Sequence, residues 1–223
     1  APRARRRGDQ HAHDAQIIDV RKANETDCSR FEGFRDSCLR VLTIGQDCSL
    51  GKMLVAVELT RALERAGHDA KFIATGQTGV MIEGDGCAID CVVADFVSGA
   101  VERQILAHEH HDILIVEGQG TLVHPKYSGV TLSLLHGCMP RGMILCYEVG
   151  RTTIHHMEHV PITPLSKVRD IFEMMANVLG PSRVIGIAMN SASVTSEEAE
   201  AERKRIRDEF GLPVCDVIRH GPD

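Results

Sequence analysis

The sequence has no excess of positive charge. It contains 25 Lys and Arg residues against 31 Asp and Glu, for a formal net charge of -6. Proteins whose main partner is a nucleic acid neutralise many phosphates with a broad basic surface. The composition therefore argues against a nucleic-acid partner, while small anionic ligands, which local groups of donors can hold, stay open.

Long apolar runs are also missing. None approaches the ~20 residues that a membrane-spanning helix needs, and no signal-peptide pattern is present. We therefore expect a cytoplasmic protein without a membrane partner. The hydrophobic content of 43% is typical of a globular protein, and 223 residues suffice for one large domain.

Closely spaced cysteine pairs are nearly absent. Of the eight cysteines, only Cys87 and Cys91 lie close together, and no second pair stands at zinc-finger spacing. This argues against a structural zinc site and against a small disulfide-stapled fold, so we expect reduced thiols.

The most informative stretch is VLTIGQDCSLGKMLVA, residues 41–56. An apolar run leads into a loop from Gly45 to Gly51, and Lys52 begins an amphipathic helix. Backbone N–H groups of such a loop, together with the helix N-terminus and the lysine, form a binding site for phosphate. The usual P-loop has four residues between its glycines and Ser or Thr after the lysine, whereas five residues and Met53 stand here. Because the missing hydroxyl normally binds Mg²⁺, the loop indicates phosphate binding more firmly than ATP hydrolysis.

Strand and helix patterns alternate along the rest of the chain. We predict strands over residues 39–44, 70–74, 112–116, 142–147, 183–189 and 214–218, and helices over 52–66, 96–108, 165–179 and 195–210, with a further helical segment ending near 135. The fold class is therefore α/β, a doubly wound and mostly parallel sheet of the P-loop NTPase-like three-layer kind.

Residues 1–38 are expected to form an N-terminal arm or linker ahead of a P-loop domain over residues 39–223. The arm is charged and poor in large apolar residues, with one short strand expected over residues 16–20. Its basic start, APRARRR, is interpreted as a solvated tail. We expect the chain to be part of a longer protein that has a further N-terminal domain.

Polar residues follow two other strands, where open α/β sheets bind ligands. A turn is expected over residues 75–79, and Glu117-Gly-Gln-Gly120 follows the strand that ends at Val116. Glu117 is predicted to face the metal that accompanies a nucleotide or its activated water, the alternative being that it caps the next turn. His124 lies just beyond, as a general base or substrate contact. The clusters at 108–111 and 155–159 are interpreted as solvated histidines, although His155 and His159 would form a metal-binding i, i+4 pair on a helix.

Four strings occur in order: residues 45–52 (GQDCSLGK), 74–79 (ATGQTG), 116–120 (VEGQG) with His124-Pro125 and Tyr127-Ser-Gly129 behind it, and 186–190 (GIAMN). Together they resemble the C-terminal P-loop domain of the bacterial DUF1611 family, which includes D-glutamate N-acetyltransferase. The resemblance covers residues 16 to about 220, and members of that family carry a Rossmann-like N-terminal domain. More distantly, the layout is similar to dethiobiotin synthetase, which implies that Asn190 contacts a base.

The two resemblances imply different chemistry. As an acetyltransferase of amino-acid metabolism, the protein would bind acetyl-CoA and an amino acid such as D-glutamate, with Lys52, Glu117 and His124 as catalytic residues. As an ATP-dependent ligase or kinase, it would need Mg²⁺ on Asp47, Asp95 and Glu117. A non-catalytic nucleotide-binding module is the third possibility. In every case a homo-oligomer is expected, and the predicted ligand contacts are Gly45, Gln46, Asp47, Cys48, Ser49, Leu50, Gly51, Lys52, Met53, Gln77, Thr78, Gly79, Gln119 and Asn190.

Overall fold

Uninterrupted apolar segments form the centre of a parallel sheet in the computed structural model, which describes residues 19–22 and 24–222. The strand order is β2-β3-β1-β4-β7-β8, and every neighbouring pair is parallel. The strands are β1 (Leu39–Gly45), β2 (Ala70–Ile73), β3 (Ile113–Val116), β4 (Gly142–Glu148), β7 (Arg183–Asn190) and β8 (Val214–Cys215). The predicted α/β sheet is thus confirmed, with a last strand shorter than expected.

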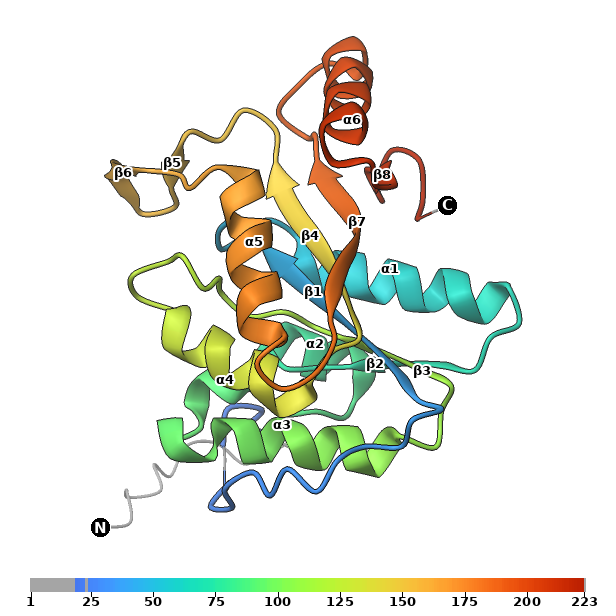
Figure 1. Cartoon of the computed structure of the whole chain (residues 1–223), viewed down its shortest axis with the longest axis vertical. Helices are drawn as coiled ribbons and strands as arrows, with labels where there is room; N and C mark the ends of the chain where they lie inside the picture. Colours follow the sequence, from blue (N-terminus) through green and yellow to red (C-terminus); the bar gives the residue numbers. More distant parts are fainter. Residues whose placement is uncertain (1–18, 23, 223) are drawn as a thin grey trace, which may run out of the picture.

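Helices cover both faces of this sheet. They are α1 (Lys52–Arg65), α2 (Gln77–Glu83), α3 (Ala94–His108), α4 (Ser128–Cys138), α5 (Leu165–Ala176) and α6 (Ser196–Phe210), with a short 3-10 turn, η1, at Ile89–Cys91. The predicted capping box at the start of α6 is present, formed by Thr195 and Glu198. In Figure 1, α3 and α4 lie side by side below the sheet.

Alternation along β1 explains the three layers. Val41 packs with Ala56 and Val57 of α1 on one face. Leu42 and Ile44 point to the opposite face, into a larger core that includes side chains of α3, α4, α5 and α6. Because successive side chains of a strand point to opposite faces, a strand buried on both sides is mostly apolar, and the two polar residues of β1, Arg40 and Thr43, are buried with hydrogen-bond partners.

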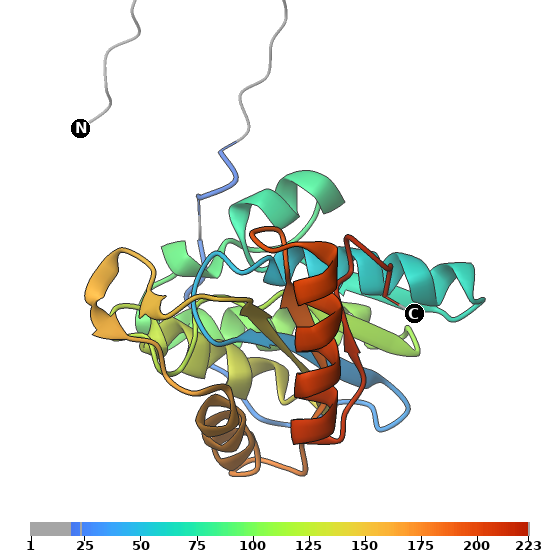
Figure 2. The ribbon, with the colours of Figure 1, turned by 90° about the horizontal axis from the view of Figure 1, so that it is seen from above.

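A small antiparallel hairpin was not predicted. It consists of β5 (Thr153–Ile154) and β6 (Met157–Pro161) and projects from the body of the molecule at the carboxyl ends of the strands (Figures 1 and 2). The histidines at 155–159 therefore lie on a hairpin, and the possible helical i, i+4 pair does not form.

The described part of the N-terminal arm contacts α3. The backbone N–H groups of Arg30 and Phe31 donate to the Glu102 carboxylate, and that of Arg35 donates to Glu109. The strand expected over residues 16–20 lies largely outside the described residues, as does the basic start of the chain.

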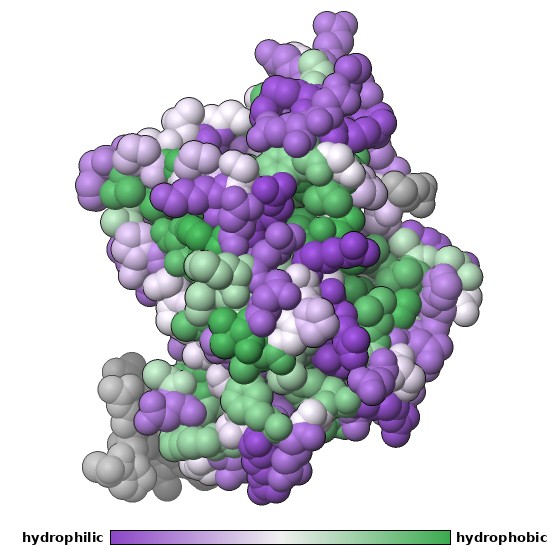
Figure 3. Space-filling view, in the orientation of Figure 1, coloured by the Kyte–Doolittle hydropathy of each residue, from purple (hydrophilic) through white to green (hydrophobic). Residues whose placement is uncertain are grey.

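The surface is unevenly polar. Figure 3 shows hydrophilic side chains concentrated over α6, where Arg203, Lys204 and Arg205 pair with acidic residues one turn away. In the described part of the chain, no helix has both the length and the apolar character required to cross a membrane.

Candidate functional site

A cavity of about 600 Å³ lies at the carboxyl ends of β1, β2 and β3. The phosphate loop, the start of α2 and the segment after β3 line it, together with two histidines of the β5–β6 hairpin. In the strand order, the connection after β1 runs toward β2 on one side and the connection after its neighbour β3 runs toward β4 on the other, so the cavity occupies the topological switch point at which α/β sheets bind ligands.

The loop between β1 and α1 presents its backbone to this cavity. Ser49 and Gly51 have positive φ angles of 54° and 97°, which turn the chain tightly ahead of α1. No side chain caps the N-terminus of α1, and its first turn has no acidic residue. The first N–H groups of α1 therefore lack a side-chain acceptor and remain suited to an anion, as predicted from the sequence.

Lys52 lies folded under the loop and is 7% exposed. Its Nζ donates to the backbone carbonyl of Asp47 at 2.8 Å. A Cβ at position 45 would stand 3.0 Å from this nitrogen and 3.1 Å from the Asp47 carbonyl oxygen, so a larger residue than Gly45 would require both to shift. Burial lowers the pKa of Lys52, because the protein solvates the ammonium group poorly. An anion bound beside Lys52 would stabilise the charged form of the side chain, and the ammonium group would in turn stabilise the anion.

Asp47 is completely buried and fully engaged. Its Oδ1 accepts from the backbone N–H of Cys48 at 2.7 Å. Its Oδ2 accepts from the Arg151 guanidinium at 3.0 Å and from the backbone N–H of His155 at 2.7 Å. Arg151 also donates to the carbonyl of Cys48 and pairs with Glu148. Asp47 thus joins the phosphate loop to the hairpin.

Glu117 directly follows β3 and is 4% exposed. Its Oε2 accepts from the backbone N–H groups of Thr75 and Gly76 at 3.0 and 2.9 Å, at the N-terminus of α2. A Cβ at Gly79 would lie 2.2 Å from the same oxygen. Burial raises the pKa of Glu117, and the two backbone donors partly oppose that shift. The carboxylate therefore caps a helix while it also lines the cavity.

The turn expected over residues 75–79 is in fact the beginning of a helix. Gln77 and Thr78 are exposed in the first turn of α2 and line the cavity, whereas Gly79 is buried against Glu117. A helix of seven residues is too short to show clear periodicity, and Gly76 and Gly79 favoured a turn prediction.

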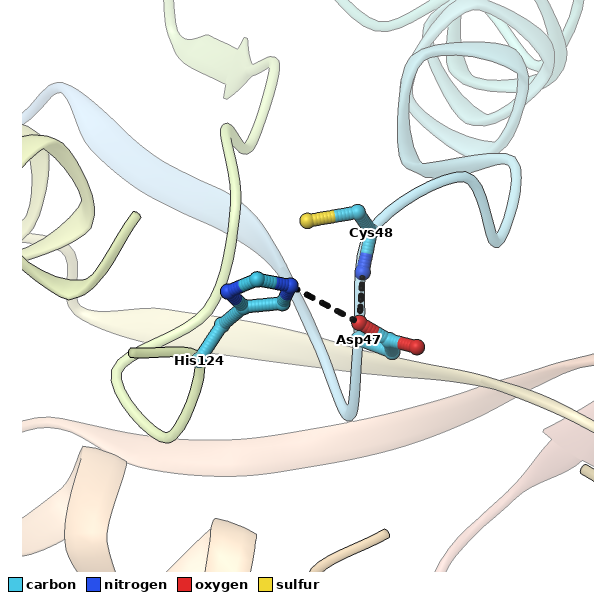
Figure 4. A group of neighbouring side chains, drawn as sticks. All are labelled: Asp47, Cys48 and His124. Carbon is cyan, nitrogen blue, oxygen red and sulfur yellow. Dashed lines mark hydrogen bonds and ion pairs between the residues drawn. The ribbon is translucent and has the colours of Figure 1, made fainter. Parts of the chain in front are cut away.

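The three carboxylates predicted for Mg²⁺ are not brought together. Asp95 is exposed on the first turn of α3 and does not line the cavity, and the oxygens of Asp47 are engaged as described. Among the described residues, the group of potential ligands that does come together is Asp47, Cys48 and His124, with one ligand atom of each within 4.8 Å of the others (Figure 4).

His124 is 1% exposed, and its ring lies 4.6 Å from that of Tyr127. Nδ1 accepts from the backbone N–H of Lys126 at 3.1 Å. Nε2 points toward Asp47 Oδ1, which is 3.9 Å away (Figure 4). Burial lowers the pKa of His124, opposed by the Asp47 carboxylate, so the ring is held in its neutral form.

A second cavity of about 260 Å³ contains Asn190. Leu50 and Gly51 line both cavities, so the phosphate loop separates them. Apolar side chains of α1, β7 and the chain after β8 form most of its wall. The contact of Asn190 with a base, which the resemblance implied, stays a prediction.

Most of the predicted site residues lie in the wall of the main cavity or directly behind it. Those that line the main cavity are Cys48, Ser49, Leu50, Gly51, Lys52, Met53, Gln77, Thr78, Glu117, Gln119 and His124. Gly45, Asp47 and Gly79 support this wall from behind, while Gln46 points away and donates to the carbonyl of Thr163. Sequence reasoning did not identify Lys126, Tyr127, His155 and His156 as cavity residues, nor Arg151 as the partner of Asp47. No spacing pattern indicated the Asp47 contact, because Arg151 lies 104 residues further along the chain.

This sheet order, with a glycine-bounded loop and a buried lysine at the switch point, defines a P-loop protein of the α/β class. Residues 26–223 match the family model described as the "Domain of unknown function (DUF1611_C) P-loop domain". The chain belongs to the DUF1611 family. A solved DUF1611 protein from Anabaena variabilis is 42% identical, with a TM-score of 0.84, over 91% of this chain and 60% of that one.

Two curated relatives carry the name D-glutamate N-acetyltransferase. The protein from a Pseudoalteromonas species is 36% identical over 95% of this chain, and that from Tritonibacter scottomollicae is 37% identical over 85%. The chain spans 64% and 57% of their respective lengths. A nucleotide-binding protein from Archaeoglobus fulgidus, solved with ADP, has a TM-score of 0.56 at 11% identity over 80% of this chain and 81% of its own, a similarity of fold alone.

Proposed function

We propose that this domain binds acetyl-CoA and forms the P-loop part of an N-acetyltransferase that acts on an amino acid such as D-glutamate. The observation that carries the proposal is the composition of the phosphate loop. The loop offers backbone N–H groups and Lys52, yet Met53 replaces the Mg²⁺-binding hydroxyl and Arg151 neutralises Asp47. Such a site suits the phosphates of a ligand that needs no metal. The names of the two relatives support the same reaction.

The two cavities divide the ligand between them. In this proposal the phosphates lie on the loop and Lys52, and the adenine occupies the cavity at Asn190. The thioester and the amino acid share the larger cavity. Acetyl-CoA supplies the activated acyl group.

Glu117 is the group best placed to take up the amine proton. Its Oε2 is occupied by two backbone donors, so in this proposal the substrate meets Oε1 at the cavity wall, beside the Gln119 side chain that also stabilises the carboxylate. A carboxylate whose pKa is raised by burial is a stronger base than an exposed one. The substrate amine attacks in its neutral form, and the proton it loses on acylation passes to Glu117.

Calorimetric titration of the chain tests this proposal, with acetyl-CoA in one series and ATP with and without Mg²⁺ in the others. We expect saturable acetyl-CoA binding that is insensitive to a metal chelator. Mass spectrometry then follows N-acetylation of D-glutamate and L-glutamate. Mg²⁺-dependent ATP binding without any response to acetyl-CoA would instead indicate the ligase or kinase reaction. Binding without turnover of either acceptor, even with the complete protein, would indicate a non-catalytic module.

A further inference from the structure

The neighbourhood of His124 contains one buried polar atom without a partner. Among the described residues, no group accepts a hydrogen bond from His124 Nε2. The Asp47 carboxylate lies 3.9 Å from Nε2, and a backbone contact with His155 also favours the protonated ring, but neither has the geometry of a hydrogen bond to Nε2. A buried donor without an acceptor loses its hydrogen bonds to water and gains none in return, so its persistence beside a cavity points to a ligand.

The hydrogen bond on the other ring nitrogen determines where the proton is. Lys126 donates its backbone N–H to Nδ1, so Nδ1 must carry a lone pair. A neutral imidazole has one N–H, which places the hydrogen on Nε2. His124 is therefore a donor at Nε2, the ring atom that faces Asp47 Oδ1 in a residue that lines the cavity, and it cannot remove a proton through Nε2 while the Lys126 contact persists.

The same contact argues against a metal ion between Asp47, Cys48 and His124, although their ligand atoms are close. A metal on Nε2 would require the proton to move to Nδ1, where it would meet the N–H of Lys126. Two cations already adjoin the group, because Arg151 pairs with Asp47 and with Glu148, and the ammonium of Lys52 bonds to the Asp47 carbonyl. The ring tautomer therefore favours a ligand atom that accepts a hydrogen bond.

We propose that His124 donates its Nε2–H to the acyl oxygen of the bound thioester as negative charge develops there. The inference rests on the acetyl transfer proposed above, and it assigns His124 a donor role in place of the general-base role expected from the sequence. As the amine nitrogen bonds to the carbonyl carbon, the C=O electron pair moves onto oxygen beside Nε2–H. The pair returns when the carbon–sulfur bond breaks, the thiolate leaves, and the amine proton passes to Glu117. His124 keeps its own proton throughout.

Two substitutions at His124 test its role as a hydrogen-bond donor separately from its role in the fold. In His124→Asn, the side-chain oxygen can still accept from Lys126, but no donor reaches the position of Nε2. In His124→Gln, the longer amide places an N–H near that position. We expect His124→Asn to lower kcat by about 100-fold with the acetyl-CoA dissociation constant unchanged, and His124→Gln to recover at least ten-fold of that loss.

Whether a variant loses kcat or ligand affinity shows which oxygen of the ligand His124 contacts. An equal loss of kcat in the two variants would overturn the donor role. A loss of acetyl-CoA and CoA affinity with unchanged kcat would place the contact on a phosphate and overturn the acyl-oxygen assignment.

A spectroscopic measurement of the His124 tautomer tests the inference independently of the proposed function. Long-range ¹H–¹⁵N spectra distinguish the two histidine tautomers, and comparison with His124→Asn identifies the His124 signals. We expect the Nε2–H tautomer at neutral pH and no change of these signals on addition of Zn²⁺. The Nδ1–H tautomer, or Zn²⁺ coordination at the ring, would overturn the inference even if acetyl-CoA binds. If acetyl-CoA fails to bind while the Nε2–H tautomer is observed, the acetyl-transfer proposal and the acyl-oxygen assignment fail together, and the donor state stands.

Discussion

Arg151 and Asp47 form an ion pair of 3.0 Å in which the aspartate side chain is 1% exposed and the arginine side chain 14%. The pair connects the phosphate loop to the β5–β6 hairpin, which is also held by the bond from the His155 N–H to Asp47. Because His155 and His156 line the cavity, the geometry of the loop and that of the opposite cavity wall depend on one buried carboxylate.

Replacing Arg151 with alanine should therefore destabilise the fold strongly. Asp47 would remain buried without its counter-charge, at a cost of about 3–5 kcal/mol. Urea unfolding measures the effect. The control is Arg205→Ala on α6, whose exposed pairs with Glu202 and Glu209 are worth about 0–1 kcal/mol. Similar losses in the two variants would show that the buried pair is not important for stability.

Lys52→Ala should weaken any phosphate-bearing ligand more than ten-fold, because one charge-assisted contact of about 1.5–3 kcal/mol is lost. Calorimetry with CoA gives the ratio of dissociation constants. Lys204→Ala, which removes an exposed lysine paired with Asp208, is the matched change of charge. Unchanged affinity in Lys52→Ala would refute the assignment of the loop as a phosphate site.

Glu117→Gln should abolish turnover while leaving ligand binding and stability nearly intact. The amide oxygen can accept the bonds from Thr75 and Gly76 that Oε2 accepts now, but an amide is not a base. Glu117→Ala should in addition lose about 1–3 kcal/mol, since it leaves two buried N–H groups unpaired. The measurements are N-acetylation rates and urea unfolding. An active Glu117→Gln protein would remove Glu117 from the catalytic residues.

Gly79→Ala should displace the Glu117 carboxylate, because the new methyl group would lie 2.2 Å from Oε2. We expect destabilisation of about 1–3 kcal/mol and a loss of turnover. Gly129→Ala is the control, since this glycine also lies in the first turn of a helix but a Cβ there would meet nothing within 4 Å. Thermal unfolding of both variants tests the contrast, and equal melting temperatures would contradict it.

Acidification should destabilise the protein partly through His124. Burial holds its folded-state pKa below the value of about 6.5 expected in the unfolded chain. As the pH falls below about 6.5, the unfolded state takes up a proton that the folded state resists, so the unfolding free energy decreases. The ring faces Asp47, Lys126 and His155, of which Asp47 opposes the shift. His124→Asn should show a shallower decrease between about pH 7 and the folded-state pKa, and parallel curves would contradict the prediction.

The alternation of strands and helices was predictable because each element has a sequence pattern of its own. Strands such as β3 are continuous apolar runs, and α6 has its capping box and a terminal glycine. The elements that the sequence did not predict are short. The seven-residue α2 appeared to be a turn, and the β5–β6 hairpin carries polar residues without a distinctive pattern.

The sequence by itself determined the position of the phosphate loop, since Gly45, Gly51 and Lys52 act through local backbone geometry within one turn of α1. Only the tertiary structure decided what surrounds that loop. Asp47 meets Arg151 from a distant hairpin, and Glu117 caps a helix that precedes it in the sequence. The tautomer of His124 likewise depends on a backbone N–H held by the fold. These roles arise from long-range packing and burial, which set the charge state and hydrogen-bond partners of a side chain. The spacing of residues along the sequence does not reveal these effects.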